Sequence, residues 1–167
     1  MITITNITIF FLTLIWGGLQ IPSSEFLTPN PNTLNSFGNR NPELIRHSFQ
    51  IWRLVTPVFL HASLLHLLFN CLSTLVIGSQ IEKLLGTVNM VIIYFATAIG
   101  GNLYGTWTST SLAVGSSTAI NGLLGCFIAY IIVNWNRIDP NLRCMMVCMI
   151  SFVVSEGNLD GLLFLIY

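Results

Sequence analysis

The sequence predicts an all-helical membrane protein, a polytopic bundle of about six transmembrane segments with the last one truncated. Three observations support this prediction. Hydrophobic residues make up 53% of the 167 residues, charged residues only 7%, and the mean hydropathy is +0.77. Soluble domains carry about 25% charged residues. Apolar stretches of about twenty residues, enough to cross a hydrocarbon core about 30 Å thick, recur along the chain.

The charge balance and the cysteines exclude several classes of function. Six Lys and Arg residues balance six Asp and Glu residues, so no basic field for nucleic acid is expected. Cysteines stand at positions 71, 126, 144 and 148, all inside apolar runs. Cys144 and Cys148 are one helical turn apart, a spacing that a metal could use, but no acidic or histidine partner lies beside them, so we expect apolar packing, no disulfide and no metal. The chain is interpreted as one integral membrane domain covering 1–167.

The first predicted segment covers 2–21 and is followed by Pro22. It has no basic n-region and no A-x-A-like cleavage site, so it is predicted to be a retained first helix. An interfacial loop, 22–60, follows and is rich in Asn, Pro and Ser. Its amphipathic end, 44–58, is expected to lie in or near the membrane interface.

Four further spans are predicted at about 64–85, 88–107, 112–135 and 142–154, with a partial sixth at 158–167. The fifth is short for a full crossing, and about ten residues cannot cross the hydrocarbon core. A truncated or mis-spliced end near residue 155 would explain the short sixth segment. With six crossings, three Lys or Arg residues lie on each face, so charge does not set the orientation.

Small and polar residues open the span that contains Ser117. The run from Val114 reads V-G-S-S-T-A-I-N-G-L-L-G, and it includes Gly115-x-Ser117. A glycine two residues before a serine lets a substrate backbone approach the hydroxyl. Taken alone, small residues in a membrane helix indicate close helix packing.

His66 and Asn70 stand four residues apart and therefore share one face of a helix. Both side chains are costly in lipid, so they are expected to point into the bundle. Two such donors aimed at one point are what a tetrahedral oxyanion requires. The alternative is an interhelical hydrogen-bonding pair without chemistry.

In order along the chain, these motifs resemble those of the rhomboid family of intramembrane serine proteases. The matching residues are Trp52-Arg53 and His61 in the loop, His66-x-x-x-Asn70, Glu82-x-x-x-Gly86 and Gly115-x-Ser117. Their order and spacing agree with the family from about residue 50 to 135. The expected fold is therefore a helix bundle of the rhomboid type.

The resemblance implies a role for each matching residue. Ser117 would be the nucleophile, with His66, Asn70 and the Ser117 backbone N–H as oxyanion donors and Gly115 allowing substrate approach. Trp52, Arg53, His61, Glu82, Gly86 and Gly161 would be structural. The family cleaves transmembrane segments by acyl transfer to serine, so the implied partners are transmembrane proteins in a bilayer. No metal or cofactor is implied.

The sequence departs from the family where the general base is expected. Asn158 stands at the position of the family's sixth-span histidine, and Asp160 and Leu165 replace small residues around Gly161. Asparagine cannot accept a proton near neutral pH, so it cannot activate a serine. Of the three histidines at 47, 61 and 66, His61 is the best substitute. This predicts an impaired or inactive enzyme.

Two functions follow from these observations. The first is a rhomboid-type serine endopeptidase of doubtful activity that uses Ser117. The alternative is a rhomboid-like pseudoprotease that binds transmembrane clients for trafficking or degradation, which Asn158 and Asp160 favour. A channel or transporter is not supported, because the spans contain no further pairs of ionisable residues.

Overall fold

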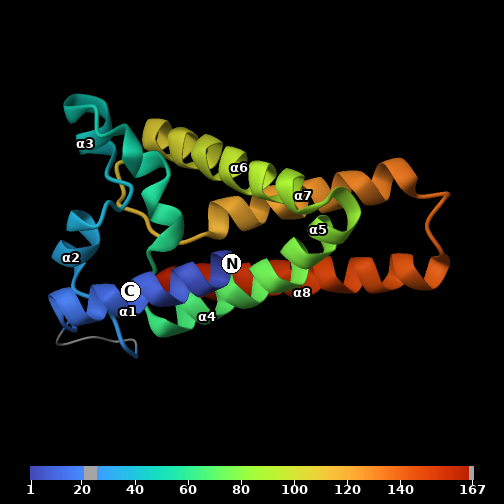
Figure 1. Cartoon of the computed structure of the whole chain (residues 1–167), viewed down its shortest axis with the longest axis horizontal. Helices are drawn as coiled ribbons and strands as arrows, with labels where there is room; N and C mark the ends of the chain where they lie inside the picture. Colours follow the sequence, from blue (N-terminus) through green and yellow to red (C-terminus); the bar gives the residue numbers. More distant parts are fainter. Residues whose placement is uncertain (21–25, 166–167) are drawn as a thin grey trace.

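The computed structural model describes residues 1–20 and 26–165, without the side chains of 152, 153 and 155–165. The described chain is helical and has no β-strand, only two isolated bridges. Its longer helices lie roughly parallel or antiparallel to one another, and α2 and α3 lie at one end of them (Figure 1). The elements, in order, are α1 (Ile2–Gly17), α2 (Pro31–Ser36), α3 (Pro42–Ser48), η1 (Ile51–Leu54), η2 (Thr56–Phe59), α4 (Leu64–Ser73), η3 (Thr74–Gly78), α5 (Ser79–Leu85), α6 (Thr87–Thr108), α7 (Ser117–Asn134) and α8 (Pro140–Leu165). The prediction of an all-helical membrane bundle is confirmed.

Three continuous helical stretches in the described residues are long and apolar enough to cross a membrane. They cover Leu64–Leu85, which includes α4, η3 and α5, then Thr87–Thr108 and Ser117–Asn134. The first two agree closely with the predicted spans. The third begins five residues later than predicted, because 112–116 form an irregular link rather than helix. α1 is apolar but has only 16 residues, and its predicted end at Ile21 and Pro22 lies outside the described residues.

The last part of the chain differs from the prediction. Separate segments at 142–154 and 158–167 were expected, but α8 is one helix of 26 residues, Pro140–Leu165. Proline at the first helical position favours helix initiation, and no proline follows it. A lone glycine such as Gly157 weakens a helix by about 1 kcal/mol without ending it. The predicted division into segments at 142–154 and 158–167 is therefore wrong.

The loop predicted at 22–60 contains short helices with defined starting signals. The side chain of Asn30 accepts a hydrogen bond from Asn32 N at α2, and that of Asn41 accepts from Leu44 N at α3. In each case a proline follows the asparagine at the first helical position. An asparagine cap before proline is a strong helix start, because the cap satisfies a free N–H and proline lacks one.

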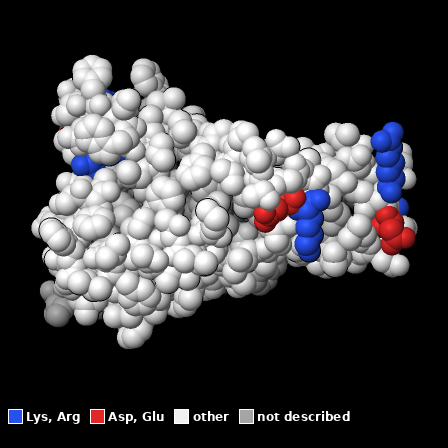
Figure 2. Space-filling model, viewed as in Figure 1, with Lys and Arg blue, Asp and Glu red and all other residues white. Residues whose placement is uncertain are grey.

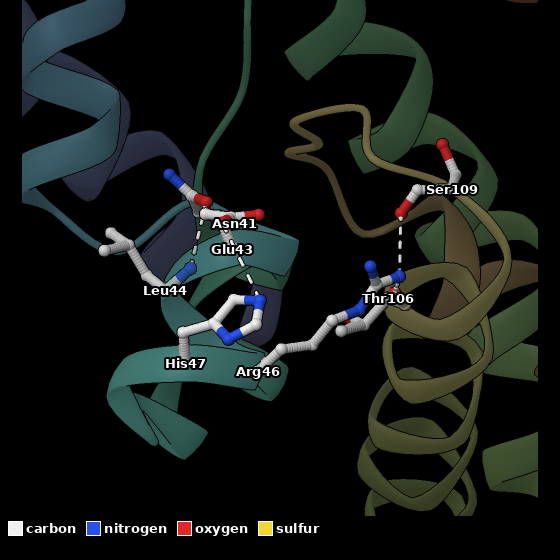
Figure 3. Close-up of polar contacts among 7 residues, drawn as sticks. All are labelled: Asn41, Glu43, Leu44, Arg46, His47, Thr106 and Ser109. Carbon is white, nitrogen blue, oxygen red and sulfur yellow. Dashed lines mark hydrogen bonds and ion pairs between the residues drawn. The ribbon is translucent and has the colours of Figure 1, made fainter.

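This loop is held against the end of α6 by arginine (Figure 3). The Arg46 guanidinium on α3 donates to the backbone oxygen of Thr106, and also to those of Trp107 and Ser109 at 3.2 and 3.5 Å. The last carbonyls of a helix have no partner inside the helix and carry partial negative charge. A cation at this point satisfies them and ties α3 to α6.

Close packing of α6 against α7 depends on small residues. A Cβ added at Gly101 would lie 3.2 Å from Thr118, and one at Gly122 would lie 2.2 Å from Thr97. The backbones therefore approach across these glycines, as small residues allow in membrane helices. Tyr94, Leu123 and Phe127 are fully buried in the apolar core beside this contact. The packing sets the position of the first residues of α7.

Candidate active site

Ser117 is the first residue of α7, at the end of the irregular link from α6. The Gly115 N–H donates to Pro57 O at 2.9 Å, which fixes this link to the loop before α4. No side chain caps the start of α7. The backbone N–H groups of its first turn are therefore available, at the positive end of a helix dipole. Ser117 is exposed, and it lies at this positive end of the helix.

His66 and Asn70 lie one turn apart on α4 and both reach the link before Ser117. A Cβ added at Gly115 would lie 2.7 Å from His66 Nε2 and 3.8 Å from Ser117 Oγ. The Ser116 hydroxyl donates to Asn70 Oδ1 at 3.1 Å. The structure thus brings together four of the residues named from the sequence: His66, Asn70, Gly115 and Ser117.

The imidazole of His66 has a defined orientation. Ser63 caps α4, and its hydroxyl oxygen accepts from His66 N at 3.2 Å. The Ala62 N–H donates to His66 Nδ1 at 3.4 Å. A ring nitrogen that accepts carries no proton, so the proton of the neutral imidazole is on Nε2. This is the nitrogen nearest to Gly115, and it can act as a hydrogen-bond donor beside Ser117.

Gly115 cannot be replaced without disturbing this arrangement. Its φ is +114°, a conformation that favours glycine. Any side chain would also meet His66 Nε2 and Cε1 at less than 3 Å. The glycine is therefore required both by the turn and by the close approach of the imidazole.

His61 lies directly behind His66. Its side chain is 1% exposed, and the two imidazole centroids are 5.3 Å apart. Burial lowers the pKa of His61 to about 3, repulsion from His66 when that imidazole is protonated lowers it further, and a hydrogen bond to the backbone of Phe59 partly offsets these effects. A base with this pKa is a poor proton acceptor near neutral pH. This argues against His61 as a substitute base.

The paired Trp52 and Arg53 have different environments. Trp52 is largely exposed, whereas Arg53 is 6% exposed within the loop. The Arg53 guanidinium donates to Asn35 O at 2.9 Å and Asn39 O at 3.0 Å. Its Nε donates to Gln50 Oε1 at 2.7 Å, and desolvation by burial lowers its pKa. Arg53 thus connects separate parts of the loop but does not reach Ser117.

Glu82 and Gly86 lie at the opposite end of the span from His66. Glu82 is exposed and accepts a hydrogen bond from the Thr87 hydroxyl at 2.7 Å. Gly86 has φ +85° and forms the sharp junction between α5 and α6. These two residues shape the turn between spans and take no part in the site around Ser117.

The position of the expected base is on α8, which contacts both α4 and α7. The side chains of Asn158, Asp160, Gly161 and Leu165 lie outside the described residues. One residue of the site was not identified from the sequence: Ser116, which is fully buried and hydrogen-bonded to Asn70. Its only sequence signal is its place between Gly115 and Ser117.

The geometry fits acyl transfer to a serine. An exposed hydroxyl lies at a helix N-terminus, with an imidazole N–H and a carboxamide converging on the same turn. Donors in this arrangement stabilise the oxyanion of a tetrahedral intermediate. The described residues contain no cluster of three or more His, Cys, Asp or Glu side chains that could hold a metal.

Known proteins that share one domain are similar to this chain in sequence. The model of the Rhomboid domain matches residues 48–159. "Rhomboid-like protease 1" of Toxoplasma gondii is 38% identical, over 87% of this chain and 48% of that protein. "Rhomboid-like protease 2" of the same organism is 32% identical, over 96% of this chain and 60% of that protein. "Inactive RHOMBOID-like protein 8" of Arabidopsis thaliana is 26% identical, over 81% of this chain and 39% of that protein. The chain spans about half the length of these relatives.

Proposed function

From the premise that this chain belongs to the rhomboid family of integral, multi-pass membrane proteins, we propose that it engages transmembrane segments of other proteins at Ser117. The family comprises serine proteases and some inactive members. Ser117 is the nucleophile of the proposed site, and hydrolysis of a peptide bond there is slow, because Asn158 stands where a base is needed.

The proposed reaction is nucleophilic attack of Ser117 Oγ on a peptide carbonyl. The oxyanion that forms is stabilised by the N–H groups of His66 Nε2, Asn70 Nδ2 and the Ser117 backbone. The serine proton must leave as the carbon–oxygen bond forms, and later a proton must reach the leaving amine. Asn158 can do neither, which lowers the rate by several orders of magnitude.

The observation that carries this proposal is the convergence of two segments at one turn. Gly115 and Ser117 come from the start of α7, and His66 and Asn70 come from α4. The positive φ of Gly115 and the closeness of His66 Nε2 are costly features for a link that only joins two helices. They are expected where a substrate backbone and an oxyanion must be accommodated.

A first prediction concerns the reactivity of Ser117. The purified chain should react with a fluorophosphonate probe slowly or not at all, because no base takes the serine proton. Exchange of Asn158→His together with Asp160→Gly and Leu165→Gly should accelerate labelling at least about a hundredfold, since a base accelerates proton transfer about 10²–10⁴-fold. Gel fluorescence over time and mass spectrometry of the labelled peptide measure the rate and the site.

The matched control for this experiment is Ser117→Ala in both backgrounds, which should remove all labelling. Asn158→His alone should be labelled more slowly than the triple variant. A displacement of the imidazole by about 1 Å lowers the reaction rate on the order of a hundredfold. Rapid labelling of Ser117 in the unaltered chain would show that another group activates the serine. Labelling of a different residue in the triple variant would refute the assignment of the nucleophile.

The second candidate function is binding of transmembrane clients without cleavage. It is favoured by Asn158, and one relative of this chain is named as inactive. A photo-crosslinker placed at Ser111, in the link between α6 and α7, should capture a model transmembrane segment in liposomes. Capture of the intact segment with no cleavage product supports the binding role. Cleavage that Ser117→Ala abolishes supports the protease.

A further inference from the structure

Four polar side chains from four different helices are buried together next to Ser117. Asn6 of α1, Tyr94 of α6 and Ser116 at the start of α7 are 0% exposed, and Asn70 of α4 is 3% exposed. Burial of polar groups in an apolar interior is costly unless they are hydrogen-bonded. Such a group of residues at one point in a membrane bundle therefore calls for a functional explanation.

Part of this cluster already forms hydrogen bonds to the carboxamide of Asn70. The Ser116 hydroxyl donates to Asn70 Oδ1 at 3.1 Å, and Asn70 Nδ2 donates to His66 O at 2.8 Å. A hydroxyl has one hydrogen and two lone pairs. Since Ser116 has used its hydrogen on Asn70, any further neighbour of its oxygen must be a donor.

The neighbour of Ser116 is Tyr94. The Tyr94 hydroxyl lies within interacting range of both Ser116 and Asn6. No described side chain is directly hydrogen-bonded to this hydroxyl, nor to Oδ1 or Nδ2 of Asn6. Buried polar atoms in proteins are hydrogen-bonded either directly or through an ordered water. Tyr94 therefore has Ser116 and Asn6 as its available partners, through a small rotation or one bridging water.

The chemistry of the groups dictates the direction of these hydrogen bonds. Ser116 can only accept, so the Tyr94 hydroxyl donates toward it. The Tyr94 oxygen then accepts from Asn6 Nδ2. Donors thus run in one direction, from Asn6 to Tyr94 to Ser116 to Asn70. Hydrogen bonds arranged in one direction polarise and strengthen one another.

This direction decides which way the Asn70 carboxamide faces. If Asn70 flipped, its Oδ1 would turn toward His66 O and its Nδ2 toward Ser116, and the Ser116 hydrogen would lose its acceptor as long as the Tyr94 hydroxyl donates to Ser116. Without the Tyr94 hydroxyl, the Ser116 hydrogen can turn away from Asn70 and its oxygen can accept from a flipped carboxamide, so only the bond from Asn70 Nδ2 to His66 O still opposes the flip. We propose that Tyr94 and Asn6 are positioning residues, which act through Ser116 to hold the Asn70 carboxamide with its N–H groups toward His66 and the oxyanion position. The link to an oxyanion rests on the proposed function, whereas the orientation of Asn70 does not.

The first test measures the orientation of the Asn70 carboxamide in the full-length protein and compares it with that in single variants. Protein labelled with ¹⁵N-asparagine in detergent micelles gives side-chain amide signals, and those of Asn70 are identified by their loss in Asn70→Ala. Tyr94→Phe keeps the ring and removes only the hydroxyl. It should split the Asn70 signals into two sets, or shift them, as the carboxamide begins to flip. Ser116→Ala and Asn6→Ala should move them in the same way.

The matched control is Tyr104→Phe, which changes an exposed tyrosine on the same helix, α6. It should leave the Asn70 signals unchanged, and so should Ser111→Ala in the link before α7. The double change Tyr94→Phe with Ser116→Ala should move the signals no further than Ser116→Ala alone, because both act on one carboxamide. Unchanged Asn70 signals in Tyr94→Phe would overturn the proposal.

The second test asks whether the orientation matters for the chemistry. In the triple variant with the restored base, Tyr94→Phe should lower the rate of fluorophosphonate labelling of Ser117 about tenfold, as expected for one hydrogen bond. Tyr104→Phe should not lower it. If the triple variant itself is not labelled, the proposed function fails and the amide signals alone decide the positioning role. If it is labelled and Tyr94→Phe labels equally fast, the role in oxyanion stabilisation is refuted.

Discussion

His61 shows how a single residue can make the stability of the loop and α4 depend on pH. It lies outside the membrane-spanning helices, between η2 and α4, with its imidazole 1% exposed. Its pKa in the folded protein is about 3, against about 6.5 for an exposed histidine. Between these values the unfolded chain binds a proton that the folded chain excludes. The contribution of the neutral His61 to stability is therefore fully present above pH 6.5, and it is lost as the pH falls toward 3.

We accordingly predict acid sensitivity that depends on His61. Between pH 7 and pH 5 the free energy of unfolding should fall by about 2 kcal/mol, because one proton contributes about 1.4 kcal/mol per pH unit below 6.5. Denaturant unfolding in detergent, followed by circular dichroism at both values, measures this loss. His61→Gln should remove most of it, and His47→Gln, at an exposed histidine of α3, should not. An equal loss in His61→Gln and the unaltered chain would contradict the buried, neutral state of His61.

At the scale of one element, the glycines of α7 differ in what they contact. Gly122 faces α6, where an added Cβ would meet Thr97 Cβ and Oγ1 at 2.2 Å. At Gly125 an added Cβ would meet no described atom within 4 Å. The two glycines stand three residues apart in the same helix, so the intrinsic helix propensity is the same at both. Only the packing of α6 against α7 separates them.

Replacement by alanine should therefore change the free energy of unfolding differently at Gly122 and at Gly125. Gly122→Ala should lower the free energy of unfolding by about 1–3 kcal/mol, because it forces α6 and α7 apart. Gly125→Ala should be neutral or stabilising by up to about 1 kcal/mol, since alanine favours the helix. Denaturant unfolding in detergent compares the two directly. A Gly122→Ala protein as stable as Gly125→Ala would mean that the close approach at Thr97 is absent.

At the scale of the whole molecule, the face drawn in Figure 2 has charged side chains near its two ends and at one position between them, and it is otherwise uncharged. One end of the molecule contains α2, α3 and the link from α6 to α7 (Figure 1). The opposite end contains the α7–α8 link, and the α5–α6 turn lies in the same half of the molecule. Arg40 joins the first group, since its backbone bonds with Ala113 in both directions at 2.9 and 3.1 Å. Few charges, placed mainly at the links between helices, are typical of a bundle that crosses a bilayer.

This arrangement predicts the sides of the membrane on which its loops lie. In a background with all four cysteines changed to alanine, Ser111→Cys and His47→Cys should react with an impermeant maleimide from the same side of sealed vesicles. Lys83→Cys and Asn136→Cys should react only from the other side. Permeabilised vesicles, in which all four react, provide the control. Reaction of Ser111→Cys and Lys83→Cys from the same side would refute the topology.

The sequence by itself determined the class of the protein and the bounds of two of its long apolar helices, and it named the residues proposed for the site. Hydropathy predicted 64–85 and 88–107 almost to the residue, because the length needed to cross a bilayer is a local property of the chain. The pairing of His66 with Asn70 follows from helical periodicity, and Gly115 with Ser117 from adjacency. The same local reasoning failed at α8, where two separate segments were predicted in what is one helix, Pro140–Leu165.

Only the tertiary structure decided how these residues meet. Ser116 lies 46 residues from Asn70 in sequence, and Arg46 lies 60 residues from Thr106, yet each pair is hydrogen-bonded. The sequence provides no period that relates such positions. The burial of Asn6 beside Tyr94, the neutral state of His61 and the closeness of Gly115 to His66 also depend on which helices pack together. Contacts across the bundle, rather than patterns along the chain, turn a set of residues into a site.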